Sequence, residues 1–133
     1  MKLLENKVCL VTGASRGIGR AIAQCMAEQG AAVAFTYLSS PEKAKALEDE
    51  LAANGVKVKG YQSDASDFAA AEKLIADVLA DFGKIDVVVN NAGITRDNLL
   101  MRMTEDSFNE VIRTNLNSVF NVTKAVQKSM LKE

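Results

Sequence analysis

TGASRGIG, at residues 12–19, joins a short apolar run to a segment of helical periodicity, and this stretch decides the fold. Its glycines allow the backbone to turn sharply and to approach a ligand closely. The free N–H groups and the positive dipole end of a following helix attract a pyrophosphate. The spacing is Gly-x-x-x-Gly-x-Gly, and an ordinary glycine-rich turn is the alternative interpretation of this stretch taken alone. The candidate cofactor-binding residues here are Thr12, Gly13, Ser15, Arg16, Gly17, Ile18 and Gly19.

Apolar runs alternate with amphipathic segments along the rest of the chain. We expect buried strands at residues 7–12, 31–37, 56–61 and 85–89. We expect helices at residues 17–29, 41–53, 67–82 and from 104 to the end. This alternation predicts a parallel sheet with helices on both faces, because right-handed crossovers place the helices there. The fold class is therefore α/β, in one domain that spans residues 1–133.

Local patterns give finer expectations for these elements. In the first helix, apolar side chains recur at helical spacing at Ile18, Ala21, Ile22, Cys25 and Met26. The second helix is expected to begin at Pro41 behind a serine cap, and the third to end at Gly83. Residues 56–61 alternate apolar residues and glycine with lysine, which predicts a strand with one wetter face. Both cysteines, Cys9 and Cys25, are expected to be small buried apolar residues.

Composition excludes several classes of partner and site. The chain has 16 basic and 17 acidic residues and a net charge of −1, so no overall field favours nucleic acid or an anionic membrane. It contains no histidine, which removes the commonest metal ligand and general base, and we expect no metal site. No apolar run has the length of a secretory leader or a membrane span. We expect a cytoplasmic protein with reduced cysteines.

The end of the second expected strand bears on which dinucleotide would bind. In dinucleotide-binding folds an acidic side chain here hydrogen-bonds the 2′-hydroxyl of NAD and disfavours the 2′-phosphate of NADP. Residues 36–40 read TYLSS and carry no carboxylate. Arg16 supplies a cation that can pair with a 2′-phosphate, although a solvated loop arginine is the alternative. The sequence therefore favours NADPH/NADP+ as the cofactor.

Four motifs together resemble those of the short-chain dehydrogenase/reductase family. They are TGASRGIG at residues 12–19, Asp64 after the third strand, NNAG at residues 90–93 after the fourth, and Asn115 in the last helix. The resemblance extends from about Lys7 to the end of the chain. It implies a Rossmann-type parallel sheet with helices on both faces, of which four of the family's seven strands are present.

The same resemblance implies roles for the residues of these motifs. Asp64 would accept a hydrogen bond from the adenine amino group, and the wall beside the cofactor would be formed by Asn91, Ala92 and Gly93. Asn115 would be a catalytic residue that holds a water for proton relay to an active-site lysine. Taken alone, Asp64 is also typical of a surface turn, and Asn115 of a helix position that faces solvent.

Residues 93–103, GITRDNLLMRM, narrow the resemblance. They are similar to the bacterial 3-oxoacyl-(acyl-carrier-protein) reductases, which implies NADPH-dependent reduction of a carrier-linked 3-oxoacyl substrate to the (3R)-3-hydroxyacyl product in fatty acid biosynthesis. Packing of these Leu and Met residues at a subunit boundary is compatible with that interpretation. The family also implies a homotetramer in which the helix from Thr104 packs against its counterpart. A related reductase acting on sugars, steroids or other carbonyls is the alternative.

The proton donor of the family has no counterpart in this chain. The resemblance implies a serine and a tyrosine followed four residues later by a lysine, whereas Tyr37 and Tyr61 are followed by Pro41 and Ala65. Family members run to roughly 250 residues as one domain. We therefore expect the N-terminal part of a reductase, truncated before the catalytic Ser, Tyr and Lys. We expect this chain to be inactive alone, with the strand at residues 85–89 as an unpaired apolar edge of its sheet. A non-catalytic dinucleotide-binding or self-associating module of this length is the alternative.

Overall fold

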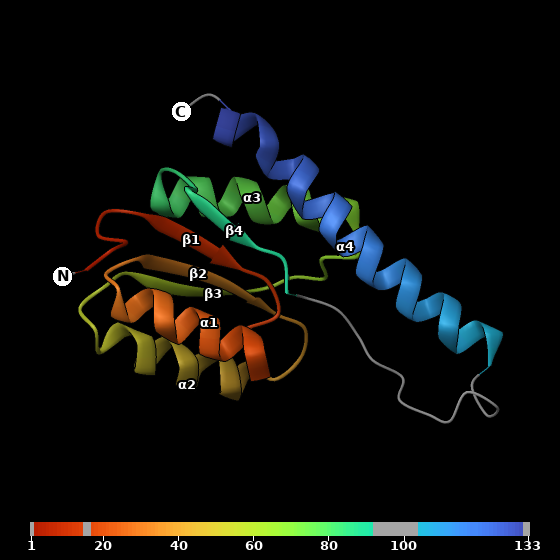
Figure 1. Ribbon diagram of the computed structural model, residues 1–133, viewed down its shortest axis with the longest axis horizontal. Helices are drawn as coiled ribbons and strands as arrows, with labels where there is room; N and C mark the ends of the chain where they lie inside the picture. The colour runs from red at the N-terminus through yellow and green to blue at the C-terminus, as the bar shows by residue number, and fades with distance from the viewer. Residues whose placement is uncertain (1, 15–16, 92–103, 132–133) are drawn as a thin grey trace.

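The computed structural model describes residues 2–14, 17–91 and 104–131. In chain order its elements are β1 (Val8–Val11), α1 (Gly17–Glu28), β2 (Ala32–Tyr37), α2 (Pro41–Ala52), β3 (Val58–Gln62), α3 (Phe68–Phe82), β4 (Val87–Val89) and α4 (Glu105–Leu131). Strand and helix alternate in the described ranges, as the sequence predicts (Figure 1).

The described strands form one parallel sheet in the order β3-β2-β1-β4. The predicted Rossmann-type α/β architecture is confirmed. The chain moves outward from β1 to β3 on one side and then crosses to β4 on the other side of β1. In open parallel sheets, ligands bind outside the carboxyl ends of the strands at such a reversal. The loops after β1 and β4 are therefore the expected place for a ligand.

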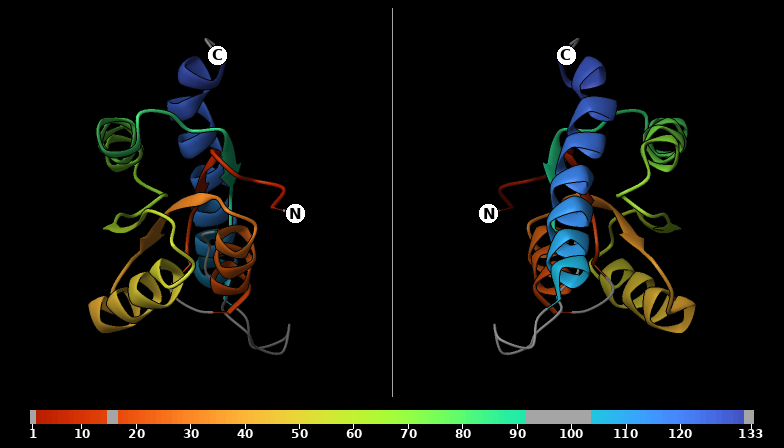
Figure 2. Two further views of the ribbon diagram at one scale, coloured as in Figure 1. Left: turned by 90° about the vertical axis from the view of Figure 1, so that its left-hand side faces the viewer. Right: turned by 90° about the vertical axis from the view of Figure 1, so that its right-hand side faces the viewer.

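Helices cover both faces of the sheet, with α1 and α2 on one face and α3 and α4 on the other (Figure 2). Strand side chains alternate between the two hydrophobic clusters, as the period of a strand requires. Cys9 and Val11 pack toward α1 and α2, whereas Leu10 packs toward α3 and α4. Because β1 is buried on both faces, its sequence is apolar throughout rather than alternating.

The first helix buries a different face from the one that its larger apolar residues suggest. Its buried residues are Gly19, Ala23 and Ala27. Ile18 and Cys25 are exposed, while Ile22 and Met26 are only half-buried. The three small residues are spaced four apart and form one row, and their size lets the helix backbone approach the sheet closely. The expectation that Cys25 is buried is therefore wrong.

β4 begins at Val87, two residues later than the expected strand. The preceding Asp86 carboxylate accepts a hydrogen bond from the Val8 N–H at 2.8 Å and lies 3.2 Å from Lys84 Nζ. Burial acts to raise the pKa of Asp86, but the bonds from Val8 and Lys84 outweigh it and hold that pKa below its ordinary value. Burial, and secondly the Asp86 charge, raises the pKa of the Cys9 thiol to about 11. Cys9 is thus buried, as expected, and protonated at neutral pH.

The ends of α2 and α3 follow local signals with one exception. Ser40 stands at the N-cap of α2, but its side chain makes no cap hydrogen bond. The start of α2 therefore depends on Pro41, whose fixed φ suits a first helical turn. Asp67 caps α3 by accepting from the Ala69 N–H at 3.1 Å, and Gly83 ends it at φ +85°.

β3 is an edge strand of the described sheet and carries charge along that edge. Its burial alternates as predicted over Val58 to Gly60. Lys59 Nζ lies 2.8 Å from Asp81 of α3, and the Tyr61 hydroxyl donates to the same carboxylate at 2.6 Å. Lys59 and then Tyr61 lower the pKa of Asp81. Charged side chains on an edge strand oppose pairing with another chain.

α4 has two apolar faces, and the described residues cover one of them. Val122 and Val126 are buried in the cluster with α3. A second set is exposed, here called the α4 apolar row: Ile112, Leu116, Val119 and Phe120. Of the two sides of α4 that were expected to be buried, the structure buries the side with Val122 and Val126. Burial of the α4 apolar row remains a prediction. No helix in the described ranges is both long enough and apolar enough to cross a membrane.

Candidate functional site

The site lies at the reversal of the sheet, where the loops after β1 and β4 meet. The Asn91 N–H donates to Thr12 Oγ1 at 3.0 Å, and Asn91 Nδ2 donates to the Gly13 carbonyl oxygen at 3.1 Å. The Thr12 N–H donates to the Val89 carbonyl oxygen at 3.1 Å. Thr12 is almost fully buried, so its hydroxyl serves this junction rather than solvent. The structure thus joins two motifs that are far apart in the sequence.

The end of β2 supports the glycine turn from the other side. The Gly13 N–H donates to Thr36 Oγ1 at 2.9 Å, and the Ala14 N–H donates to the Thr36 carbonyl oxygen at 3.0 Å. Gly13 has φ +67°, a left-handed conformation that other residues adopt only with strain. Sequence reasoning assigned no role to Thr36. The signal that could have found it is a threonine near the end of an otherwise apolar strand, because a buried hydroxyl needs a hydrogen-bond partner.

Two further glycines of the turn have opposite surroundings. Gly17 begins α1 at φ +64°, and a Cβ at this position would meet nothing within 4 Å. Gly19 is buried, and a Cβ there would lie 2.4 Å from both the Gly13 carbonyl oxygen and Asn91 Nδ2. Gly17 therefore meets a requirement of backbone conformation, whereas Gly19 meets a requirement of space.

The N-terminus of α1 suits an anionic ligand. The first N–H groups of a helix have no acceptor within it, and the helix dipole places partial positive charge there. Ile18, in this first turn, is 74% exposed, so apolar surface lies beside the free donors. These features fit the pyrophosphate of a dinucleotide with apolar groups of the same ligand nearby.

Asp64 follows β3 at the same edge of the sheet. Its Oδ1 accepts from the Ser66 N–H at 2.9 Å and from the Ser66 hydroxyl at 2.6 Å. Its carbonyl oxygen accepts from the Asp67 N–H at 3.1 Å. The carboxylate is exposed, and its Oδ2 makes no hydrogen bond to a described residue. One carboxylate oxygen is therefore able to accept from an exocyclic amine.

Asn115, the candidate catalytic residue, is half-buried in α4. Helical periodicity places it on the same face as the buried Ser118 and Val122. Asn115 therefore lies at the boundary between this buried face and solvent, and its catalytic role stays a prediction.

The structure brings Thr12, Gly13, Gly19 and Asn91 together. Asp64 follows β3 and Asn115 lies on α4, and no hydrogen bond between described residues joins either of them to that group. Four candidates lie outside the described residues: Ser15, Arg16, Ala92 and Gly93. Residues 93–103, which indicated the substrate class, also lie outside them. In the part of the chain that the structure describes, no group of three or more His, Cys, Asp or Glu side chains could hold a metal ion.

Comparison with known families agrees with this geometry. The model of the short chain dehydrogenases matches residues 7–133, which include the glycine turn, Asp64, Asn91 and Asn115. The chain belongs to the short-chain dehydrogenase family. The resemblance drawn from the motifs is confirmed.

Curated relatives of this short-chain dehydrogenase include reductases of carrier-linked substrates. The chain is 51% identical over 129 residues to the 3-oxoacyl-(acyl-carrier-protein) reductase FabG of Escherichia coli K12, covering 97% of this chain and 51% of the relative. It is 50% identical over 128 residues to FabG of Staphylococcus aureus Mu50, covering 96% and 52%. The chain thus spans about half the length of these relatives.

Solved structures of the family superpose closely on the chain. A short chain dehydrogenase from Burkholderia cenocepacia J2315 in complex with NADP has a TM-score of 0.88 at 38% identity, covering 96% of this chain and 52% of that one. NAD+-bound xylitol dehydrogenase has a TM-score of 0.92 at 35% identity, covering 98% and 50%. Members with either nicotinamide dinucleotide therefore share this fold.

Proposed function

We propose that this chain is the cofactor-binding part of a cytoplasmic, NADPH-dependent 3-oxoacyl-(acyl-carrier-protein) reductase. The reaction reduces a carrier-linked 3-oxoacyl group to the (3R)-3-hydroxyacyl group in fatty acid biosynthesis. The observation that carries the proposal is the hydrogen-bonded junction of the glycine turn with Asn91 at the reversal of the sheet. The substrate class is supported by identities of 48% to 51% with the FabG relatives.

In this proposal the residues of the chain hold and orient the dinucleotide. The first turn of α1 and the backbone near Gly13 take the pyrophosphate, and the Asp64 carboxylate accepts from the adenine amino group. The reduced nicotinamide, when bound, supplies a hydride. Asn115 holds a water through which a proton is relayed. No tyrosine of this chain has a lysine four residues later, so we propose that the chain alone does not turn over substrate.

The choice of NADPH over NADH is proposed from the surroundings of the adenine ribose. Tyr37 ends β2 and Leu38 follows it, at the place where an acidic residue would disfavour a 2′-phosphate. Arg16 is proposed to pair with that phosphate, because a guanidinium forms charge-assisted hydrogen bonds with phosphate oxygens. The similar short chain dehydrogenase in complex with NADP supports this choice. Because the similar xylitol dehydrogenase binds NAD+, the choice is tested directly by comparing the two cofactors.

Binding and turnover test the proposal together. The 133-residue chain is expected to bind NADPH at least about tenfold more tightly than NADH in calorimetric titration, because the 2′-phosphate gains a charge pair. The Arg16→Leu variant should reduce this preference. The chain should not reduce acetoacetyl thioester, whereas the protein encoded by the complete reading frame should reduce it with NADPH.

Controls separate the alternatives. Lys73→Leu removes an exposed lysine of α3, whose ion pair with Asp77 is on the surface, and should leave the cofactor preference unchanged.

Preference for NADH in the wild-type chain would contradict the NADPH proposal, and binding of neither dinucleotide would contradict the dinucleotide role. Oxidation of xylitol with NAD+ by the complete protein, without thioester reduction, would favour a polyol or sugar enzyme, as the similarity to xylitol dehydrogenase suggests. A complete frame without a Tyr-x-x-x-Lys motif would favour the non-catalytic module.

The α4 apolar row is proposed to lie between copies of the complete protein in a homotetramer. A lysine at Leu116 would place a charge in an apolar contact, so Leu116→Lys is expected to dissociate the assembly in sedimentation velocity. Asn117→Lys changes the exposed neighbour and should leave the assembly intact. An unchanged sedimentation coefficient for Leu116→Lys would rule out this surface as the contact.

A further inference from the structure

The middle of α4 contains a buried asparagine that no motif accounts for. Asn121 is 6% exposed, and its Nδ2 donates to the Ala65 carbonyl oxygen at 3.1 Å. By contrast, Asn109 and Asn117 of the same helix are exposed. A buried amide is unfavourable unless it is hydrogen-bonded, so the bond to the Ala65 carbonyl compensates for the burial of Asn121.

The acceptor of this bond belongs to the turn that carries Asp64. Ala65 follows Asp64 directly and is itself buried. The bonds from Ser66 and Asp67 to Asp64 run within this turn and set its shape. On the side before Asp64, the Ser63 N–H donates to the Tyr37 carbonyl oxygen at 3.1 Å and ties the start of the turn to β2. The Asn121 bond reaches the residue after Asp64 from α4, so it holds the turn from its other side.

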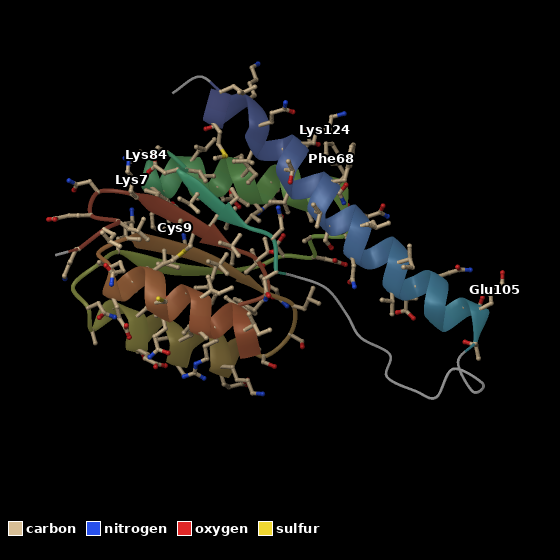
Figure 3. The ribbon with its side chains drawn as sticks, viewed as in Figure 1. Lys7, Cys9, Phe68, Lys84, Glu105 and Lys124 are labelled. Atoms are coloured by element: carbon tan, nitrogen blue, oxygen red, sulfur yellow. The ribbon has the colours of Figure 1, made fainter. Side chains whose placement is uncertain are left out.

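Neighbouring residues of α4 hold the surroundings of the same turn. Lys124 Nζ lies 5.9 Å from the centroid of the Phe68 ring, and Phe68 is the first residue of α3. Figure 3 shows these two side chains beside each other. Thr123 Oγ1 accepts from Asn90 Nδ2 at 3.2 Å, in the loop after β4. One segment of α4 thus contacts both the turn after β3 and the loop after β4.

We propose that Asn121 is a positioning residue for the adenine end of the dinucleotide. It fixes the Ala65 carbonyl and thereby holds the neighbouring Asp64 carboxylate where the adenine amino group binds. The inference rests on the proposed function, in which Asp64 accepts from adenine. It assigns to α4 a part in binding that is separate from the catalytic role proposed for Asn115.

The test compares ligands that contain one end of the dinucleotide. Asn121→Leu removes the donor, and Asn121→Asp keeps the size of the side chain but replaces the donor by an acceptor. Both variants are expected to bind NADPH and adenosine 2′,5′-bisphosphate about tenfold more weakly. Binding of reduced nicotinamide mononucleotide should be unchanged. Asn117→Leu is the matched control and should bind all three ligands as the wild-type chain does.

Each outcome decides the inference. If folded Asn121→Asp or Asn121→Leu chains bind the bisphosphate with wild-type affinity, Asn121 has no positioning role. Equal loss of affinity for the bisphosphate and the mononucleotide indicates a merely structural effect and also overturns the inference. If the wild-type chain binds neither NADPH nor the bisphosphate, both the proposed function and the role of Asn121 are wrong. Amide hydrogen exchange at Ser66 and Asp67 gives a second readout, which reports whether Asn121 orders the turn that carries Asp64. Unchanged exchange in both variants would contradict this ordering role of Asn121.

Discussion

The Gly19→Ala variant is expected to bind NADPH at least about 100-fold more weakly than the wild-type chain. The added Cβ would lie 2.4 Å from the Gly13 carbonyl oxygen, 2.4 Å from Asn91 Nδ2 and 3.0 Å from Ala14 Cα. Two of these atoms are backbone, so the glycine turn itself has to move. The same displacement would disturb the Asn91 bond to Gly13 that joins the two loops. Calorimetric titration measures the affinity, and thermal unfolding shows whether the variant is folded.

Gly55→Ala is the matched control at the opposite edge of the sheet. Gly55 has φ +79°, and a Cβ there would meet nothing within 4 Å. Alanine in this left-handed conformation should lower the free energy of unfolding by about 1 kcal/mol and leave NADPH affinity unchanged. If Gly19→Ala binds NADPH as tightly as Gly55→Ala does, the steric requirement at Gly19 is wrong.

Phe35→Ala is expected to lower the free energy of unfolding by about 3–5 kcal/mol. Phe35 is among the largest fully buried side chains, and its ring lies in the cluster between the sheet and α1 and α2. Domains of this kind are stable by about 5–15 kcal/mol, so this loss is a large fraction of the whole stability. Urea denaturation followed by far-ultraviolet circular dichroism measures the change, because the chain contains no tryptophan.

The neighbour of Phe35 on β3 provides an internal check of this prediction. A Cβ at Gly60 would lie 2.7 Å from Phe35 Cζ, so the ring occupies the space that glycine leaves free. Gly60→Ala should therefore destabilise the wild-type chain more than it destabilises a Phe35→Leu chain, in which the side chain is smaller. Equal destabilisation in the two backgrounds would show that the ring and Gly60 are not coupled.

Much of the fold could be predicted because its signals are local. The alternation of apolar runs with amphipathic segments is visible along the chain, and it led to the parallel sheet in the observed layers. Asp67 and Gly83 mark the two ends of α3 through the conformations that these residues favour. The glycine turn and the NNAG motif, two of the four motifs that indicated the family, each begin directly after a strand.

Contacts between distant residues were decided only by the tertiary structure. Apolar periodicity in α1 pointed to its larger side chains, but close packing on the sheet selected the row of Gly19, Ala23 and Ala27. The bond from Gly13 to Thr36 and the bond from Asn121 to Ala65 join segments that no local pattern relates. A hydrogen bond depends on where two elements stand in space, whereas periodicity reports only which side of one element is apolar. The sequence by itself therefore determined the elements, their order and the family, and the tertiary structure decided which polar side chains hold the candidate site together.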